Sequence, residues 1–126
     1  MMSIVKFARI NGHTPTITRD LGMYSAKCEC NCGEYLVILR TEPLRSVTLA
    51  LERLLAMVLT EHSLIVMGNQ GWKCLLCGRV APLESDHIIS RAQGRDDRVI
   101  NLRGLCNADH RARHRENIRP ADTART

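Results

Sequence analysis

Four side chains in the second half of the chain are of types that can bind a metal ion or transfer a proton during hydrolysis. Asp86 and His87 are adjacent, and His110 and His114 lie four residues apart. A free imidazole titrates near about pH 6.5, so His87 could take a proton from water at neutral pH. Two histidines four apart share one face of a helix and can reach one metal ion, which could take up charge on a phosphate. We therefore expect a metal-dependent hydrolytic site here.

Cysteines stand before and after these residues. Cys74 and Cys77 form a Cys-x-x-Cys pair, and Cys106 follows much later. Such a pair with a distant second set of ligands is typical of a structural tetrahedral zinc site. The alternative for six cysteines in a short chain is a disulfide framework, but residues 1–6 have neither the basic start nor the apolar run of a signal peptide. We interpret the cysteines as intracellular metal ligands.

The order of these residues resembles the HNH nuclease motif, over about residues 70–116. Asn101 completes it, fourteen residues after His87 and nine before His110. The resemblance implies that His87 is the general base, that Asn101 ties the loop and orients His87, and that Asp86 and His110 hold the catalytic ion, with His114 as a third ligand. A carboxylate suits Mg²⁺ or Mn²⁺, and imidazole extends the choice to Zn²⁺ or Ni²⁺.

The zinc motif departs from the family pattern at one position. The resemblance places a cysteine at residue 109, where this chain has Asp109. Either Asp109 supplies an oxygen ligand, or a ligand such as Cys28 comes from elsewhere, or the site is weakened. We expect zinc to be retained. The predicted set is Cys74, Cys77, Cys106 and Asp109.

Basic residues accompany the motif. The net charge is +5, and residues 70–126 contain eleven Lys and Arg against seven Asp and Glu. A guanidinium can donate two hydrogen bonds to one phosphate, so the arginines of the polar segment 90–98, and Arg103 after it, are candidates for DNA phosphate contacts. The alternative is a solubilising surface. These candidates are Arg91, Arg95, Arg98 and Arg103.

The elements that position the motif should form a small α+β fold. We expect Asp86 and His87 on a strand, with side chains on opposite sides, and His110 and His114 on a helix that begins near Leu105 or Cys106. With the second strand, this is a zinc-stabilised ββα-metal module of the His-Me finger type at residues 68–117. Residues 118–126 should form a flexible tail.

Residues 1–67 are expected to form a preceding ββα module like a zinc ribbon. Apolar and β-branched residues predict strands at 4–10, 35–39 and 14–18. Apolar residues at helical spacing predict a long helix over about 43–64, with Thr41 as its cap and Pro43 in its first turn. The glycines of residues 68–71 mark the boundary between the modules.

A second zinc ion is a candidate in this first half. Its ligands would be His13, Cys30, Cys32 and His62, with Cys28 as a substitute. The set resembles, weakly, small phage zinc modules with a Cys-x-Cys-Gly turn and a helix that ends in histidine. The alternative is that these cysteines are buried or incidental and that His62 is an ordinary helix residue.

The function predicted from the sequence is a metal-dependent HNH endonuclease that hydrolyses DNA phosphodiester bonds, encoded by a phage and active in the host cytoplasm, as a monomer or a homodimer. One alternative is a non-catalytic, zinc-dependent nucleic-acid-binding protein, and another is an accessory factor that acts with phage DNA packaging proteins. The most apolar stretch, 47–67, contains charged residues, so we expect no membrane span.

Overall fold

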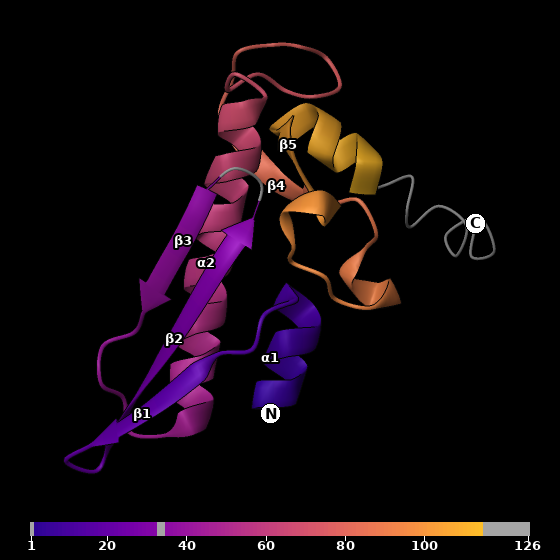
Figure 1. The fold of residues 1–126 in the computed structure, drawn as a ribbon. Coiled ribbons are helices and arrows are strands. Elements are labelled where there is room, and N and C mark those ends of the chain that lie inside the picture. Colours follow the sequence, from indigo (N-terminus) through magenta and orange to yellow (C-terminus); the bar gives the residue numbers. More distant parts are fainter. Residues whose placement is uncertain (1, 33–34, 115–126) are drawn as a thin grey trace.

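The computed structural model describes residues 2–32 and 35–114, with backbone alone at residues 30–32 and 35. It has the expected mixed α+β architecture (Figure 1). The expected tail at 118–126 lies outside the described residues. The elements, in chain order, are α1 (Ile4–Asn11), β1 (Thr16–Asp20), β2 (Met23–Cys32), β3 (Tyr35–Arg40), α2 (Val47–Asn69), β4 (Leu83–His87), β5 (Leu102–Cys106) and a helical segment at residues 107–114.

The first half is a three-stranded antiparallel sheet in the order β1-β2-β3, with α2 packed on one face. Alternate residues of β2, Ala26 and Cys28, are buried among the leucines of α2, while Lys27 faces away. Two strands match the predictions for 14–18 and 35–39. The strand β2 and the helix α1 were not predicted, and they make this half larger than the expected ββα module.

Residues 4–10 form the helix α1, so the predicted strand there is wrong. Ser3 is the N-cap, and its hydroxyl accepts a hydrogen bond from the backbone N–H of Lys6. Gly12 ends the helix at a φ of 77°, a conformation that costs glycine little. Phe7 and Ile10, three residues apart, are buried against α2. The β-branched content suggested a strand, but the cap and this helical spacing decided the element.

The long helix α2 begins and ends later than expected. Its N-cap is Ser46, whose hydroxyl accepts from the N–H of Leu49, and Pro43 therefore precedes the helix. Thr41 is buried instead, where its hydroxyl accepts from the N–H of Ala26. The helix runs to Asn69, so the expected boundary after residue 67 falls inside it. Within the described residues, no helix is long and apolar enough to cross a membrane.

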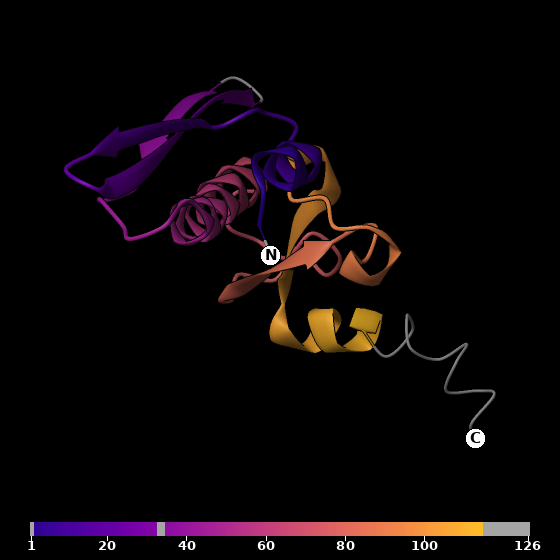
Figure 2. The same cartoon turned by 90° about the horizontal axis from the view of Figure 1, so that it is seen from below.

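The second half begins where α2 ends. Strands β4 and β5 pair antiparallel, and the helical segment at 107–114 follows, in the expected ββα order. The helix starts two residues later than expected, because Leu105 and Cys106 still belong to β5. Seen from below, α2 lies between the sheet and the β4-β5 pair (Figure 2). One helix thus supports both halves.

The contact of α2 with β5 depends on Gly104. A Cβ atom there would lie 2.9 Å from Cγ of Met67. The side chain of Gln70 bridges the same point: its Nε2 donates to the carbonyl of Gly104, and its Oε1 accepts from the N–H of Gly104, at 2.9 and 2.8 Å. The end of α2 is therefore fixed to the strand that precedes the candidate catalytic helix.

Candidate active site

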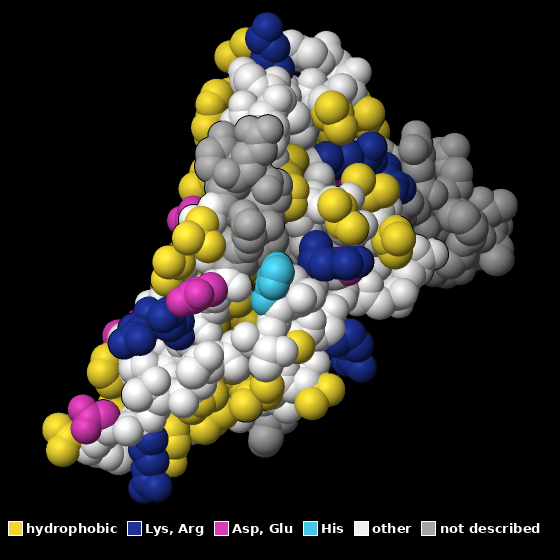
Figure 3. Space-filling model, viewed as in Figure 1, with side chains coloured by type: hydrophobic (Ala, Val, Ile, Leu, Met, Phe, Trp, Pro, Cys, Tyr) yellow, Lys and Arg dark blue, Asp and Glu magenta, His cyan; other side chains and the backbone are white. Residues whose placement is uncertain are grey.

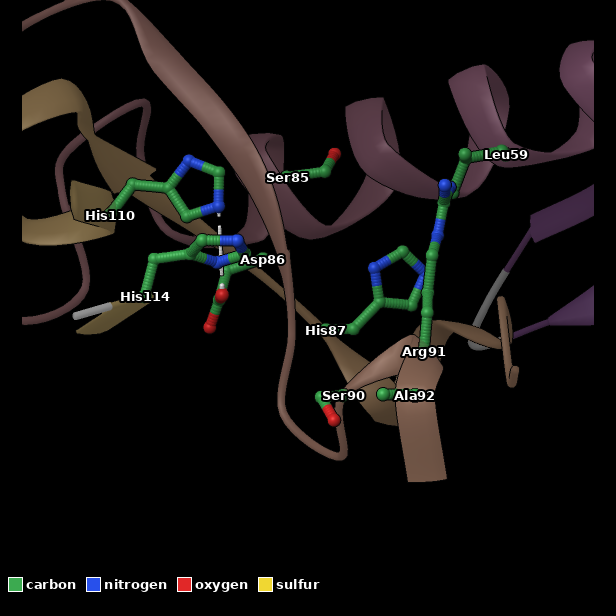
Figure 4. A pocket seen from close by; sticks show the side chains of 9 residues that line it. All are labelled: Leu59, Ser85, Asp86, His87, Ser90, Arg91, Ala92, His110 and His114. Carbon is green, nitrogen blue, oxygen red and sulfur yellow. Dashed lines mark ion pairs between the residues drawn. The ribbon is translucent and has the colours of Figure 1, made fainter. Parts of the chain in front are cut away.

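A cavity of about 490 Å³ opens between β4, the loop after it, α2 and the helical segment at 107–114. It contains four of the residues predicted from the sequence and one of the candidate arginines (Figure 4). The side chains that line it are Leu59, Ser85, Asp86, His87, Ser90, Arg91, Ala92, His110 and His114.

The carboxylate of Asp86 lies among three neighbouring side chains. It is 4% exposed, which requires that its charge be compensated. Its Oδ2 accepts a hydrogen bond from Nε of Arg103 at 2.8 Å and lies 3.8 Å from Nε of Arg113. Its Oδ1 lies 3.7 Å from Nε2 of His110. One carboxylate oxygen therefore faces the expected metal-binding histidine, while the other is held by arginine.

His110 is oriented by Glu84, which sequence reasoning missed. Oε1 of Glu84 lies 2.8 Å from Nδ1 of His110, so Nε2 is the ring nitrogen that faces Asp86. The hydrogen bond from His110 holds the pKa of the Glu84 carboxyl below its ordinary value. A carboxylate on the far nitrogen of a metal-binding histidine is a common arrangement. The alternation of β4 could have revealed it, because Glu84 and Asp86 are two apart and share one face.

His114 lies beside His110 but does not complete a tight cluster. The two ring centroids are 5.9 Å apart in an edge-to-face arrangement, and both rings line the cavity. Among the described residues, the tight groups of three or more metal-binding side chains do not include Asp86, His110 and His114 together. The structure therefore brings Asp86 and His110 close together, and His114 lines the same cavity.

His87 points away from Asp86, as expected for neighbours on a strand, and contacts Asp97. Nε2 of His87 lies 2.8 Å from Oδ1 of Asp97, whose side chain is fully buried. Burial raises the pKa of Asp97, but hydrogen bonds from His87 and Arg95 outweigh it and leave that pKa below its ordinary value. An ionised carboxylate only accepts hydrogen bonds, so Nε2 of His87 carries a proton, and in the neutral ring the lone pair lies on Nδ1.

Asp97 also joins the two halves of the protein. Its backbone N–H donates to the carbonyl of Ile10 in α1 at 3.0 Å, and its carbonyl lies 2.8 Å from Nδ1 of the buried His62 in α2. Its carboxylate accepts from Nε and Nη2 of Arg95. In the sequence Asp97 is one charged residue of a polar loop, and nothing distinguished it from its solvated neighbour Asp96.

Asn101 holds the loop after β4, as the resemblance implied, but it affects His87 only indirectly. Its Oδ1 accepts from the N–H of Ile89 at 2.8 Å, and its Nδ2 donates to the carbonyls of Ile89 and Asp96. Among the described residues it makes no hydrogen bond to His87. It fixes the backbone beside Asp97, and the carboxylate of Asp97 orients the imidazole.

Three of the four candidate phosphate-contacting arginines are engaged within the chain. Arg95 pairs with Asp97, Arg98 with Asp96 and Arg103 with Asp86, each at 2.8 Å. Arg91 lines the cavity and, among the described residues, forms no ion pair. Arg95, Arg98 and Arg103 therefore each bind a carboxylate of the chain itself. Of the four candidates, Arg91 is the one whose charge is available to a phosphate.

The predicted zinc ligands converge in the structure. Ligand atoms of Cys74, Cys77, Cys106 and Asp109 all lie within 4.8 Å of one another, and Sγ of Cys77 is 3.9 Å from Sγ of Cys106. Two thiolates on a tetrahedral zinc, each about 2.3 Å from the ion, stand roughly 3.8 Å apart. The donor set thus fits a zinc ion with three thiolates and one carboxylate. Oδ2 of Asp109 lies 3.0 Å from Sγ of Cys74 and 3.4 Å from Sγ of Cys106, so Asp109 would supply the fourth ligand.

The candidate zinc set of the first half stays a prediction. The side chains of Cys30 and Cys32 lie outside the described residues. His62 is fully buried, and its Nδ1 is next to the Asp97 carbonyl, so Nε2 would be its ligand atom. Cys28 packs in the apolar core, where burial, and then the charge of Glu29, raise its pKa and disfavour the thiolate that a metal requires.

Comparison with known proteins agrees with this geometry. The family model described as HNH endonuclease matches residues 74–116. No curated protein and no solved structure matches the chain. The matched segment begins at the first zinc-site cysteine and contains β4, β5 and the helical segment with both histidines. Residues 74–116 therefore match the HNH endonuclease family model, which suggests a nuclease-type function.

Proposed function

We propose that the protein is a metal-dependent endonuclease that hydrolyses phosphodiester bonds in DNA. The observation that carries the proposal is the cavity in which Asp86, His87, His110 and Arg91 meet. A histidine base, a carboxylate-imidazole pair for a divalent ion and a cation for phosphate are the components that this reaction needs. The match to the HNH endonuclease model supports the same reaction class.

The residues fit a catalytic divalent cation. Oδ1 of Asp86 and Nε2 of His110 face each other at 3.7 Å, and His114 lines the same cavity. These three would hold the ion, which when bound offers positive charge to the phosphate and the leaving oxygen. A carboxylate oxygen suits Mg²⁺ or Mn²⁺, and the imidazoles also allow Zn²⁺ or Ni²⁺. Glu84 keeps Nε2 of His110 directed at this position.

The proton transfer belongs to His87 and Asp97. Because the carboxylate of Asp97 holds the proton on Nε2, Nδ1 of His87 accepts the proton from the attacking water. As His87 becomes imidazolium, the buried carboxylate beside it offsets the new charge. Arg91, exposed at the mouth of the cavity, binds a phosphate oxygen. These roles assign the charged and imidazole side chains of the cavity wall to binding or to proton transfer.

The zinc site would serve as the frame of this cavity. Cys106 ends β5 and Asp109 lies in the helical segment just before His110. A zinc ion held by both, and by Cys74 and Cys77, would fix the start of that segment relative to the turn at residues 74–78. Structural zinc commonly supplies much of the folding free energy of a small module, and here the buried apolar cluster is small: Cys74, Leu105 and Cys106.

A plasmid-nicking assay tests the proposal. The purified protein is incubated with supercoiled plasmid and Mg²⁺, Mn²⁺, Zn²⁺ or Ni²⁺, with a chelator as the metal-free control. We expect metal-dependent conversion to nicked or linear DNA, and loss of about a hundredfold or more in rate for His87→Ala. Gln93→Ala, an exposed change in the same loop, is the matched control. Wild-type cleavage by His87→Ala would show that the base is assigned wrongly.

A second candidate is a zinc-dependent nucleic-acid-binding protein without turnover. The ion pair of Asp86 with Arg103 favours it, because an arginine competes with a cation for that carboxylate. Arg103→Ala separates the two: freeing Asp86 should strengthen binding of the catalytic ion in a nuclease, and should only weaken DNA binding in a binder. Cleavage that appears only when phage packaging proteins are added would instead identify an accessory factor.

A further inference from the structure

We propose that α1, which lies outside the matched family segment, forms a second binding site for the DNA backbone together with the loop at residues 94–95. It deepens the proposed function, since the ligand is the same DNA strand that the catalytic cavity would bind. The site is a cavity of about 620 Å³. Its lining residues are Met2, Lys6, Arg9, Ile10, Gly94 and Arg95.

The polar side chains of this second cavity are all cationic. Lys6 and Arg9 are three apart on α1 and therefore share one face of the helix. Within the described part of the chain neither forms an ion pair, and no carboxylate lines the cavity. In the space-filling view most of the visible acidic side chains lie over the sheet, at the left (Figure 3). Lys6 and Arg9 thus bring two positive charges without an acidic partner among the described residues to this cavity.

Few other cations near the catalytic cavity remain available for phosphates. Arg95, Arg98 and Arg103 each have an acidic partner at 2.8 Å, so their charges are offset before DNA arrives. A DNA-binding protein gains most of its nonspecific affinity from neutralising several phosphates. If Arg91 supplies one such contact, Lys6 and Arg9 can supply two more, because neither forms an ion pair within the described part of the chain.

Both cavities are lined by residues that contact Asp97. His87, in the wall of the catalytic cavity, contacts the Asp97 carboxylate, and Ile10, in the wall of the second, accepts a hydrogen bond from the Asp97 N–H. Arg95 lines the second cavity and contacts the same carboxylate. A strand with one phosphate in the catalytic cavity can therefore place another against Lys6 and Arg9. This continuity favours a polymer of phosphates over a small anion.

The test measures DNA affinity without cleavage. All proteins carry His87→Ala, and fluorescence anisotropy gives the Kd for a short duplex at several KCl concentrations. The variant is Lys6→Gln/Arg9→Gln. The matched control is Lys27→Gln/Arg40→Gln, which also removes one lysine and one arginine, from a register pair on the sheet face that points away from α2. Melting temperatures check that each protein is folded.

We expect the α1 variant to weaken binding about tenfold or more near 0.1 M salt. The slope of log K against log salt should fall by about 1 to 2, corresponding to one or two lost phosphate contacts. The control should keep the parent slope, and Arg9→Lys should restore part of what Arg9→Gln loses. Competition with inorganic phosphate should have little effect on the duplex Kd.

Equal slopes for parent, variant and control would overturn the inference, as would displacement of the duplex by millimolar inorganic phosphate. The proposed catalysis is judged separately, by nicking with the His87-containing protein. A protein that nicks DNA but has an unchanged slope in the α1 variant retains its function and loses this site. A protein that binds with the predicted slope change but never nicks keeps the site and loses the catalytic assignment.

Discussion

Asp97→Asn is the substitution that tests the site most directly. Asparagine has the shape of aspartate but exchanges one carboxylate oxygen for an NH₂ group. The backbone bonds of residue 97 to Ile10 and His62 do not involve the side chain and should persist. The variant therefore removes the charge beside His87 and Arg95 while leaving the junction of the two halves in place.

Its effects on stability and on catalysis should differ in size. The amide can accept from either His87 or Arg95 but cannot replace the bidentate contact, and Arg95 is 32% exposed, so solvent compensates part of the loss. Hydrogen bonds to charged groups contribute about 1.5–3 kcal/mol when buried, which gives about 1–2 kcal/mol here after screening. If the NH₂ group faces Nε2 of His87, the ring proton moves to Nδ1, and general-base catalysis worth about 10² to 10⁴ in kcat is lost.

The assay pairs plasmid nicking with thermal unfolding. Asp96→Asn is the matched control, since Asp96 is the preceding residue and its carboxylate pairs only with the exposed Arg98 among the described residues. We expect Asp96→Asn to cleave within about threefold of wild type, because a surface ion pair contributes roughly 0–1 kcal/mol. Asp97→Asn should lower kcat at least a hundredfold under conditions where it is fully folded.

Two results would refute this reasoning. Cleavage by Asp97→Asn at a rate near wild type would mean that His87 does not depend on the carboxylate. Equal losses in Asp97→Asn and Asp96→Asn would mean that the loop matters only through its overall charge. Loss of kcat without change in melting temperature would instead assign Asp97 a direct effect on His87.

Three further changes have outcomes that the structure sets. Asp109→Ala should lower zinc content and melting temperature, whereas Asp109→Cys should preserve both; full zinc retention by the alanine variant would remove Asp109 from the ligand set. Gly104→Ala should cost about 1–3 kcal/mol in denaturant unfolding, because the new methyl group meets Met67 at 2.9 Å, and a smaller loss would mean that the helix end yields. The lowered pKa of Asp97 predicts a contribution to stability that is complete above about pH 4, near the unfolded value, and is lost as pH falls through the lower folded value. The stability difference between wild type and Asp97→Asn should therefore close in acid; a constant difference down to pH 2 would contradict it.

The elements that could be predicted are those whose signal is local. The strand at 35–39 and the long helix were predicted from apolar residues, the strand with Asp86 and His87 was expected from the motif, and the structure contains all three. Residues 4–10 were predicted wrongly, since β-branched content outweighed the Ser3 cap and the burial of Phe7. Tertiary packing decides such short segments, because a two-turn helix has little stability of its own.

The sequence by itself predicted the reaction class and the residues that could carry it. Metal ligands and bases are recognisable by type and spacing, and the four zinc-site residues were identified with Asp109 among them. Only the tertiary structure decided the partners of those residues. Asp97 beside His87, and Arg103 on Asp86, are contacts between segments ten and seventeen residues apart. In the sequence a charged loop residue looks the same whether it is solvated or buried against a catalytic imidazole, and the difference arises when α1 and α2 pack around residue 97.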